Sequence, residues 1–223
     1  MKSEKPYPSL TQSRYYLVLE LLSIYVILPT ILFFFVSPPV LPLLWLVTIL
    51  CTWAIFRDRT FDRKSLWRVS AFKNHSKTMF IQFVIISILL FALVYLFMPE
   101  LLFYLIKENP LFWFLIIFFY PLASVYPQEL LYRTFFFHRY QALFTKRWEM
   151  ITINALLFGY MHIVFHNWIA ILLTIGGGFL FAWMYERTRS TLLVSLAHAL
   201  YGNLLFTLGL GIYFYNGTMG TIF

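Results

Sequence analysis

The sequence alternates long apolar runs that carry almost no charge with short connections rich in arginine and lysine. An apolar run of about 20 residues crosses the hydrocarbon of a bilayer as a helix, because a helix satisfies its own backbone hydrogen bonds. Of the 223 residues, 61% are hydrophobic and 12% are charged, which is more apolar surface than a soluble domain of this size uses. The sequence therefore predicts an all-α, polytopic membrane helical bundle that forms a single integral membrane domain over residues 1–223.

We expect seven to eight transmembrane helices. The segment Gln128–Phe144 decides the number, because it could be a tilted span or a helix at the membrane interface. The first apolar run lacks a small-residue cleavage site, so we expect a retained span there. The other predicted spans are Tyr15–Val36, Val40–Phe56, Thr78–Met98, Leu111–Val125, Glu149–Phe165, Trp168–Tyr185 and Thr191–Tyr213.

The basic residues predict the orientation of these helices. The segment Arg57–Lys77 contains seven basic and two acidic residues, and the loop Glu186–Arg189 is also basic. Short basic loops stay in the cytoplasm, which places the N-terminus there as well. We therefore expect a protein of the bacterial cytoplasmic (inner) membrane, in contact with membrane lipids. The net charge of +8 needs no nucleic-acid partner to explain it, and the sequence does not predict an oligomeric state.

Small residues recur at every fourth position of the Trp168–Tyr185 run. Thr174, Gly178 and Ala182 have the spacing that lets the backbones of two membrane helices approach closely. We expect this helix to pack tightly beside a neighbour, in preference to bending at Gly176–Gly178.

One polar stretch, Tyr126–Tyr140, interrupts the apolar sequence near its middle. Glu129 lies in it directly before further Leu and Phe residues, where an ionisable side chain is costly and marks a functional site with a nearby partner. Arg133 follows four residues later and shares a helix face with it. Pro127 suits the first turn of that helix. The stretch by itself fits a catalytic carboxylate and a purely structural ion pair equally well.

Histidines lie in two later apolar runs. His162 follows Phe158 by four residues, and the spacing of Asn154, His162 and His166 predicts one stripe on a helix. His198 lies early in the last predicted span, and a lone buried histidine is more often a hydrogen-bonded core residue than a catalyst.

Several such groups on separate apolar segments are a different case. Each would be costly alone, and the economical arrangement is one shared polar cavity. We therefore expect a polar site inside the bundle, where the following side chains converge: Glu129, Arg133, His162 and His198.

These residues support two chemistries. In one, a Glu carboxylate and a His activate water by general-base catalysis, while other polar groups stabilise an oxyanion. In the other, zinc is held with an open position for water by Glu129, His162, His166 and His198. The HExxH signature is absent, so we favour the metal-free chemistry, with no cofactor, and keep zinc as the alternative. A serine or thiol nucleophile has little support, because no Gly-x-Ser-x-Gly appears and Cys51 has no histidine near it in sequence.

Three motifs lie in a core of residues 111–210: Gln128-Glu129-x-x-x-Arg133, Phe158-x-x-x-His162, and His198 within Ala-His-Ala-Leu-Tyr. Together they resemble the CPBP (Abi) family, which includes CAAX prenyl endopeptidases and bacteriocin-processing or self-immunity proteins. The resemblance implies a helical intramembrane protease of glutamic type, often described as a metalloprotease. In that family, Glu129 and His162 would activate water and Arg133 would hold the carboxylate. His198 with a following amide would form the oxyanion site.

The sequence departs from the family pattern at two positions. The family usually has two consecutive glutamates, and the first, often credited with activating water, is Gln128 here. The third motif usually has Asn or Asp four residues after its histidine, where this chain has Gly202, with Asn203 one residue further. Either Glu129 and Asn203 take over these roles, or the protein kept the cavity and lost the protease.

We therefore predict an intramembrane endopeptidase that cleaves a membrane-associated peptide or lipidated protein. The predicted catalytic residues are Glu129, His162, His198 and Asn203, supported by Arg133 and Gln128. One alternative is a non-catalytic membrane factor that binds a peptide or confers immunity, and another is the zinc-dependent form of the same protease. A transporter would need two related halves with paired broken helices, and the sequence shows no such symmetry.

Overall fold

The computed structural model describes residues 13–35 and 40–214, and within these ranges every regular element is a helix. The main helices, some joined by π-helical or 3₁₀ turns, are α1 (Arg14–Leu22), α2 (Leu28–Phe33), α3 (Val40–Phe56), α4 (Val69–Phe97), α5 (Tyr104–Glu108), α6 (Pro110–Tyr120), α7 (Tyr126–Glu129), α8 (Phe136–Arg139), α9 (Arg147–Met161), α10 (Trp168–Thr188) and α11 (Thr191–Leu208). The membrane helical bundle expected from the apolar runs is confirmed.

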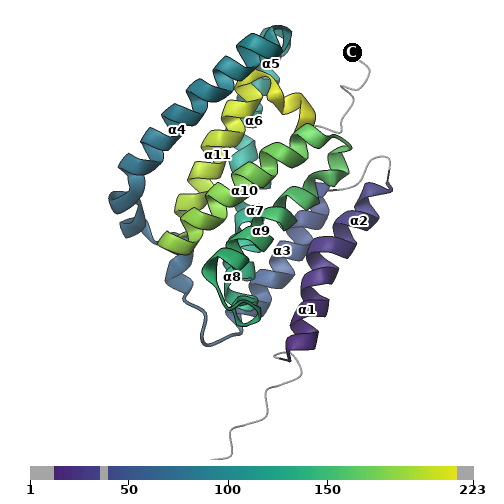
Figure 1. Ribbon diagram of the computed structural model, residues 1–223, viewed down its shortest axis with the longest axis vertical. Coiled ribbons are helices and arrows are strands. Elements are labelled where there is room, and N and C mark those ends of the chain that lie inside the picture. Colours follow the sequence, from purple (N-terminus) through teal and green to yellow (C-terminus); the bar gives the residue numbers. More distant parts are fainter. Residues whose placement is uncertain (1–12, 36–39, 215–223) are drawn as a thin grey trace, which may run out of the picture.

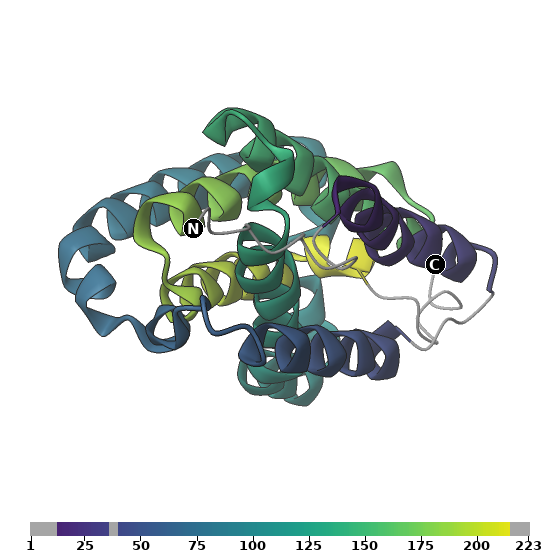
Figure 2. The same ribbon diagram turned by 90° about the horizontal axis from the view of Figure 1, so that it is seen from below.

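The helices lie side by side as one elongated bundle (Figure 1). In the view along the bundle, the teal-to-green segment 110–139 lies between α4 at one edge and α1 and α2 at the other (Figure 2). Large apolar side chains such as Phe80, Leu89 and Phe97 point outward from α4 and are 63–76% exposed. Such a surface is suited to contact with lipid, because a large exposed apolar surface is unfavourable in water.

In the described residues, six helices are long and apolar enough to cross a membrane, and α3 is a shorter apolar helix. These seven agree with the lower of the two expected numbers. Two expected boundaries are wrong: α4 begins at Val69, so the end of the basic segment is helical, and α11 ends at Leu208, where Gly209 adopts a left-handed φ of 94°. The last residue of the first predicted span, Val36, lies outside the described residues.

The predicted break before Gln128 does not exist. Pro110–Arg139 is one continuous helical segment of 30 residues, here called the central helix. It contains π-helical turns at Pro121–Val125 and Leu130–Phe135. The expectation that Pro127 begins a new helix was therefore wrong, because the wider turns let the chain continue past two prolines.

Side chains from other helices satisfy the backbone carbonyls that these prolines leave free. A proline has no N–H for the carbonyl four residues earlier. For Pro127 that carbonyl is Ala123 O, and the indole Nε1 of Trp45 donates to it at 2.9 Å. For Pro121 it is Ile117 O, and the amide Nδ2 of Asn203 donates to it at 3.2 Å. The central helix thus keeps its irregular backbone because its neighbours supply the missing donors.

The expected close packing of α10 is confirmed. Gly178 faces α9, where a Cβ added to it would lie 3.0 Å from backbone atoms of Ala155. Thr174 and Ala182 are buried on the same helix, which continues without a break through its glycines. Helix α10 therefore holds α9, and with it His162, in a fixed position.

The two basic loops lie at the same end of the bundle. The guanidinium of Arg68 donates to Thr188 O at 3.4 Å, and the hydroxyl of Ser190 donates to Arg68 O at 3.1 Å. Nearby, hydrogen bonds from the backbone N–H and hydroxyl of Thr60 lower the pKa of the Asp58 carboxyl to about 2. His138 lies 2.9 Å from the same carboxylate and connects this loop to α8.

Candidate active site

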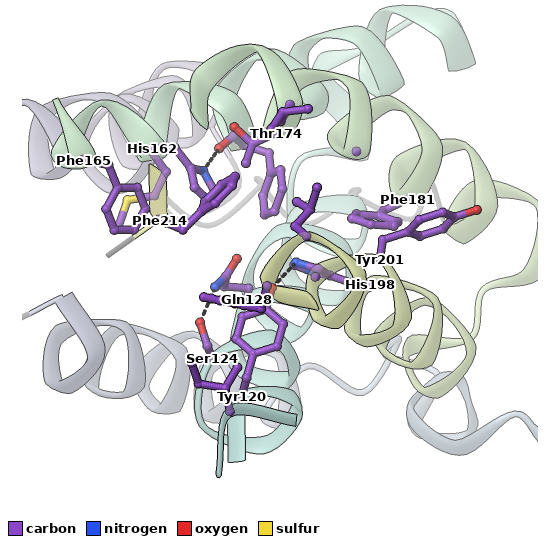
Figure 3. Close-up of a pocket in the computed structure, with 18 of the residues that line it drawn as sticks. Tyr120, Ser124, Gln128, His162, Phe165, Thr174, Phe181, His198, Tyr201 and Phe214 are labelled. Atoms are coloured by element: carbon purple, nitrogen blue, oxygen red, sulfur yellow. Dashed lines mark hydrogen bonds between the residues drawn. The ribbon is translucent and has the colours of Figure 1, made fainter. Parts of the chain in front are cut away.

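A cavity of about 750 Å³ lies among α3, α4, the central helix, α9 with the 3₁₀ turn that follows it, α10 and α11. Its walls are mainly aliphatic and aromatic. Polar side chains are grouped at a few points of the wall: Tyr120, Ser124, Gln128, His162, Thr174 and His198 (Figure 3). A concave apolar space with few convergent polar groups is the usual form of a ligand or active site.

Behind one wall lies a buried array of charged and polar groups. Glu129 and Arg133 are both fully buried, and Arg133 Nε lies 3.2 Å from Glu129 Oε2, as their spacing of four residues predicts. The other carboxylate oxygen, Oε1, lies 2.8 Å from His198 Nδ1. Glu129 itself is not among the residues that line the cavity. The carboxylate therefore reaches the cavity only through His198.

Arg133 is held from its other side by α9 and α10. One guanidinium nitrogen donates to Asn154 Oδ1, and Asn154 Nδ2 donates to Tyr132 O at 2.6 Å. The guanidinium carbon lies 4.8 Å from the centre of the Phe158 ring and 6.0 Å from that of Phe181. These contacts compensate a buried cation by charge, hydrogen bonding and cation–π attraction.

The hydrogen bonds indicate which nitrogen of each histidine carries the proton. A carboxylate beside an arginine only accepts, so we assign the proton of the His198–Glu129 bond to Nδ1. The lone pair of neutral His198 is then on Nε2, where the Tyr120 hydroxyl donates to it at 3.2 Å. His162 Nδ1 donates to Phe158 O at 2.7 Å, so its lone pair is on Nε2 as well.

The expected convergence holds for three of the four residues. Glu129, Arg133 and His198 form one connected array. His162 lines the same cavity across from Tyr120 and Ser124, without a hydrogen bond to the array among the described contacts (Figure 3). The rings of His162 and His198 both pack against Phe158, at 5.0 and 5.6 Å between centres. Phe158 therefore separates the two imidazoles.

Gln128 lies on the cavity wall, one residue before Glu129. Its Nε2 donates to the hydroxyl of Ser124 at 2.8 Å, while its buried Oε1 has no partner within the described residues. The residue that faces the cavity at this turn is thus an amide, which accepts hydrogen bonds but does not take up a proton.

The stripe expected for His162 and His166 is wrong, and Asn203, which stays a predicted site residue, has a structural contact. The helix of His162 ends at Met161, so His162 and His166 do not share a stripe, and His166 instead packs its ring against Phe33 at 4.4 Å. Asn203 lies outside the set of cavity-lining residues, because its amide binds the carbonyl that Pro121 leaves free.

The proposed zinc ligands do not fit a metal site. Among the described residues, no group of three or more His, Cys, Asp or Glu side chains could hold a metal ion. Glu129 uses its oxygens on Arg133 and His198, and His166 packs on Phe33 and is not among the residues that line the cavity. Zinc ligands need free lone pairs directed at one point, and these four residues do not provide that arrangement.

Tyr120 contacts His198 from the central helix, and no sequence motif predicted this contact. Tyr120 lies at the end of a plain apolar run, eight residues before Gln128, so no spacing rule connects it with the motifs. Gly202 was the available signal, because a glycine inside an apolar helix often marks the close approach of another group.

Comparison with known proteins agrees with the motifs. Residues 106–205 match the family model described as type II CAAX prenyl endopeptidase Rce1-like. The matched segment is slightly under half of the 223-residue chain and contains Glu129, His162 and His198. It supports the resemblance to CPBP and CAAX protease-like proteins. No curated protein and no solved structure matches the chain.

Proposed function

We propose that this chain, whose residues 106–205 are similar to the Rce1-like CAAX endopeptidases, is an intramembrane endopeptidase that uses His198 as its general base. The observation that carries the proposal is the buried array Arg133–Glu129–His198, which ends at the cavity with a lone pair on Nε2. A carboxylate on the far nitrogen of a histidine fixes its tautomer and stabilises the imidazolium that forms when it takes a proton.

Glu129 then acts as a positioning residue, which differs from the direct role expected from its motif. Its carboxylate is enclosed and contacts His198, so a water in the cavity meets the imidazole first. Arg133 holds the carboxylate in place. His162, on the opposite wall, presents a second Nε2 lone pair that can orient the attacking water.

The apolar walls suit a substrate that is itself held in the membrane. An extended peptide or a lipidated segment could enter between helices without exposing its apolar parts to water, and the few polar groups would fix its backbone. A dry, preorganised site also strengthens each of these polar contacts.

The proposal is tested by reconstituting the purified protein in phospholipid vesicles with a library of internally quenched peptides. Cleavage should be detected by mass spectrometry, and His198→Ala should reduce the rate by about 100-fold or more, since general-base catalysis is worth 10²–10⁴-fold. His75→Ala is the matched control, because His75 lies outside the cavity and its Nδ1 bonds the backbone carbonyl of Ala71 instead of a carboxylate. A folded protein that cleaves no peptide, or full activity in His198→Ala, would contradict the proposal.

A non-catalytic peptide-binding factor is the second candidate, and Gln128 favours it. The cavity wall there carries an amide where the resembled motif has a carboxylate. In that case the protein would retain intact library peptides, and a substitution that fills the cavity, such as Gly177→Phe, would abolish their binding. Replacing Gln128 by Glu would then produce cleavage only if the rest of the site is still competent.

A further inference from the structure

Tyr120 is held with its hydroxyl at the reactive end of His198. The hydroxyl lies 3.2 Å from Nε2 and lines the cavity, and the ring packs edge-on against Phe206 at 5.4 Å between centres. Because Nδ1 of His198 is engaged by Glu129, the hydroxyl is the donor in this bond. A neutral hydrogen-bond donor is thus fixed beside the group that we propose as the base.

Gly202 makes this position possible. A Cβ added to Gly202 would lie 2.4 Å from the Tyr120 hydroxyl oxygen and 2.4 Å from Cε1. Both distances are far below van der Waals contact, so the phenol occupies the space into which any side chain at position 202 would project. The tyrosine hydroxyl reaches His198 only because residue 202 has no side chain.

The side chain that was expected to stabilise the oxyanion is committed elsewhere. Asn203 donates to Ile117 O at 3.2 Å and is not among the residues that line the cavity. Moving its amide to the cavity would leave a carbonyl of the central helix without a donor, which is costly in an apolar environment. The donor next to His198 is therefore Tyr120.

We propose that Tyr120 is a further catalytic residue, whose O–H donates to the substrate carbonyl oxygen as negative charge develops on it; this inference rests on the proposed function. When substrate and water occupy the cavity, the Tyr120 O–H turns from His198 Nε2 to the substrate carbonyl oxygen and frees the Nε2 lone pair. His198 Nε2 then takes one proton from the water, the water oxygen bonds to the carbonyl carbon, and the carbonyl π electrons move to the oxygen that Tyr120 contacts. The oxyanion electrons then re-form the C=O bond while the C–N bond breaks with its electron pair on nitrogen, and the proton on His198 passes to that nitrogen. The products are a carboxylic acid and an amine, and Tyr120 keeps its proton throughout.

The test compares cleavage with affinity for a mimic of the tetrahedral intermediate. The probes are the quenched peptide library and a phosphinic pseudopeptide library with the same side chains, both in phosphatidylcholine and phosphatidylglycerol vesicles. Tyr120→Phe removes one oxygen and should lower the cleavage rate by about 100-fold, the usual effect of one oxyanion donor. It should also weaken phosphinate binding much more than binding of the corresponding amide peptide.

Two further variants separate the hydroxyl from the ring. Gly202→Ala displaces the phenol and should lower the rate in wild-type protein, but add little in the Tyr120→Phe background, because residues that act as one unit are non-additive. Tyr160→Phe is the matched control, since its hydroxyl makes a 2.8 Å hydrogen bond to Thr30 outside the cavity. Its rate should equal that of wild type.

The outcomes distinguish the two proposals. If wild type cleaves and folded Tyr120→Phe retains both its rate and its preference for the phosphinate, the inference fails and the proposed function stands. If Asn203→Ala instead loses that preference, the donor is Asn203 and the inference also fails. If wild type neither cleaves nor prefers the phosphinate, both proposals fail. Should Tyr120→Phe not fold, the rate and phosphinate affinity of Gly202→Ala decide in its place.

Discussion

Glu129 is fully buried although it carries a charge, and its neighbours on two sides account for this. Arg133 compensates the negative charge, and His198 Nδ1 donates a hydrogen bond to the remaining carboxylate oxygen. Removing one member of a buried ion pair typically costs 3–5 kcal/mol, whereas replacing both by apolar or neutral groups often costs little. This asymmetry separates a structural role of Glu129 from a functional one.

A double-mutant cycle on Glu129 and Arg133 uses that difference. Glu129→Gln should lower the free energy of unfolding by about 3–5 kcal/mol and abolish cleavage, because it leaves Arg133 unpaired and His198 without its carboxylate. Arg133→Met in the Glu129→Gln background should recover stability but not activity. Melting temperature in detergent and cleavage rate are measured together. Recovery of both would reduce Glu129 to a counter-ion of Arg133.

Metal removal tests the zinc alternative at the same residues. Because the four candidate ligands do not converge on one point, we expect incubation with 1,10-phenanthroline to leave the cleavage rate unchanged. Elemental analysis of the purified protein should find far less than one zinc per chain. Loss of activity on stripping that zinc restores would establish a metal site and overturn this expectation.

At the scale of elements, the central helix depends on donors from its neighbours. Trp45 and Asn203 each supply the hydrogen bond that a proline withholds from a carbonyl four residues earlier. A membrane helix tolerates proline on this condition. The packing of α3 and α11 against the central helix is therefore fixed by polar contacts as well as by apolar ones.

The structural role of Asn203 gives a prediction for this element. Asn203→Ala should lower the free energy of unfolding by about 1–3 kcal/mol, because Ile117 O is left without a donor. In a Pro121→Ala background, a backbone N–H becomes available and the same substitution should cost less. The cleavage rate per folded molecule should stay near that of wild type in Asn203→Ala. A large loss of rate with unchanged stability would return Asn203 to the catalytic site.

At the scale of the whole molecule, the two basic loops share one end of the bundle, and we predict that this end is cytoplasmic. In a Cys51→Ala background, Lys64→Cys and Arg187→Cys should resist a membrane-impermeant maleimide added to intact cells. Lys107→Cys, in the connection between α4 and the central helix, should be labelled. Labelling of positions 64 or 187 from outside would reverse the predicted orientation.

The sequence by itself determined the class of fold and part of the site. Apolar runs of bilayer length leave a helical bundle as the solution, and the four-residue spacing of Glu129 and Arg133 places them together on any helix. The same cost of burial predicted that His198 would join them, because buried polar groups require partners. These inferences depend on local geometry and on solvation, which the sequence carries directly.

Only the tertiary structure decided which groups face the cavity. The turn that buries Glu129 exposes Gln128, and the helix of His162 ends one residue too early to align His166. Asn203 is used by Pro121, eighty-two positions away, and Gly202 leaves its space to Tyr120. Such choices depend on how distant helices fill one volume and satisfy each other's backbone, and no local spacing in the chain encodes that.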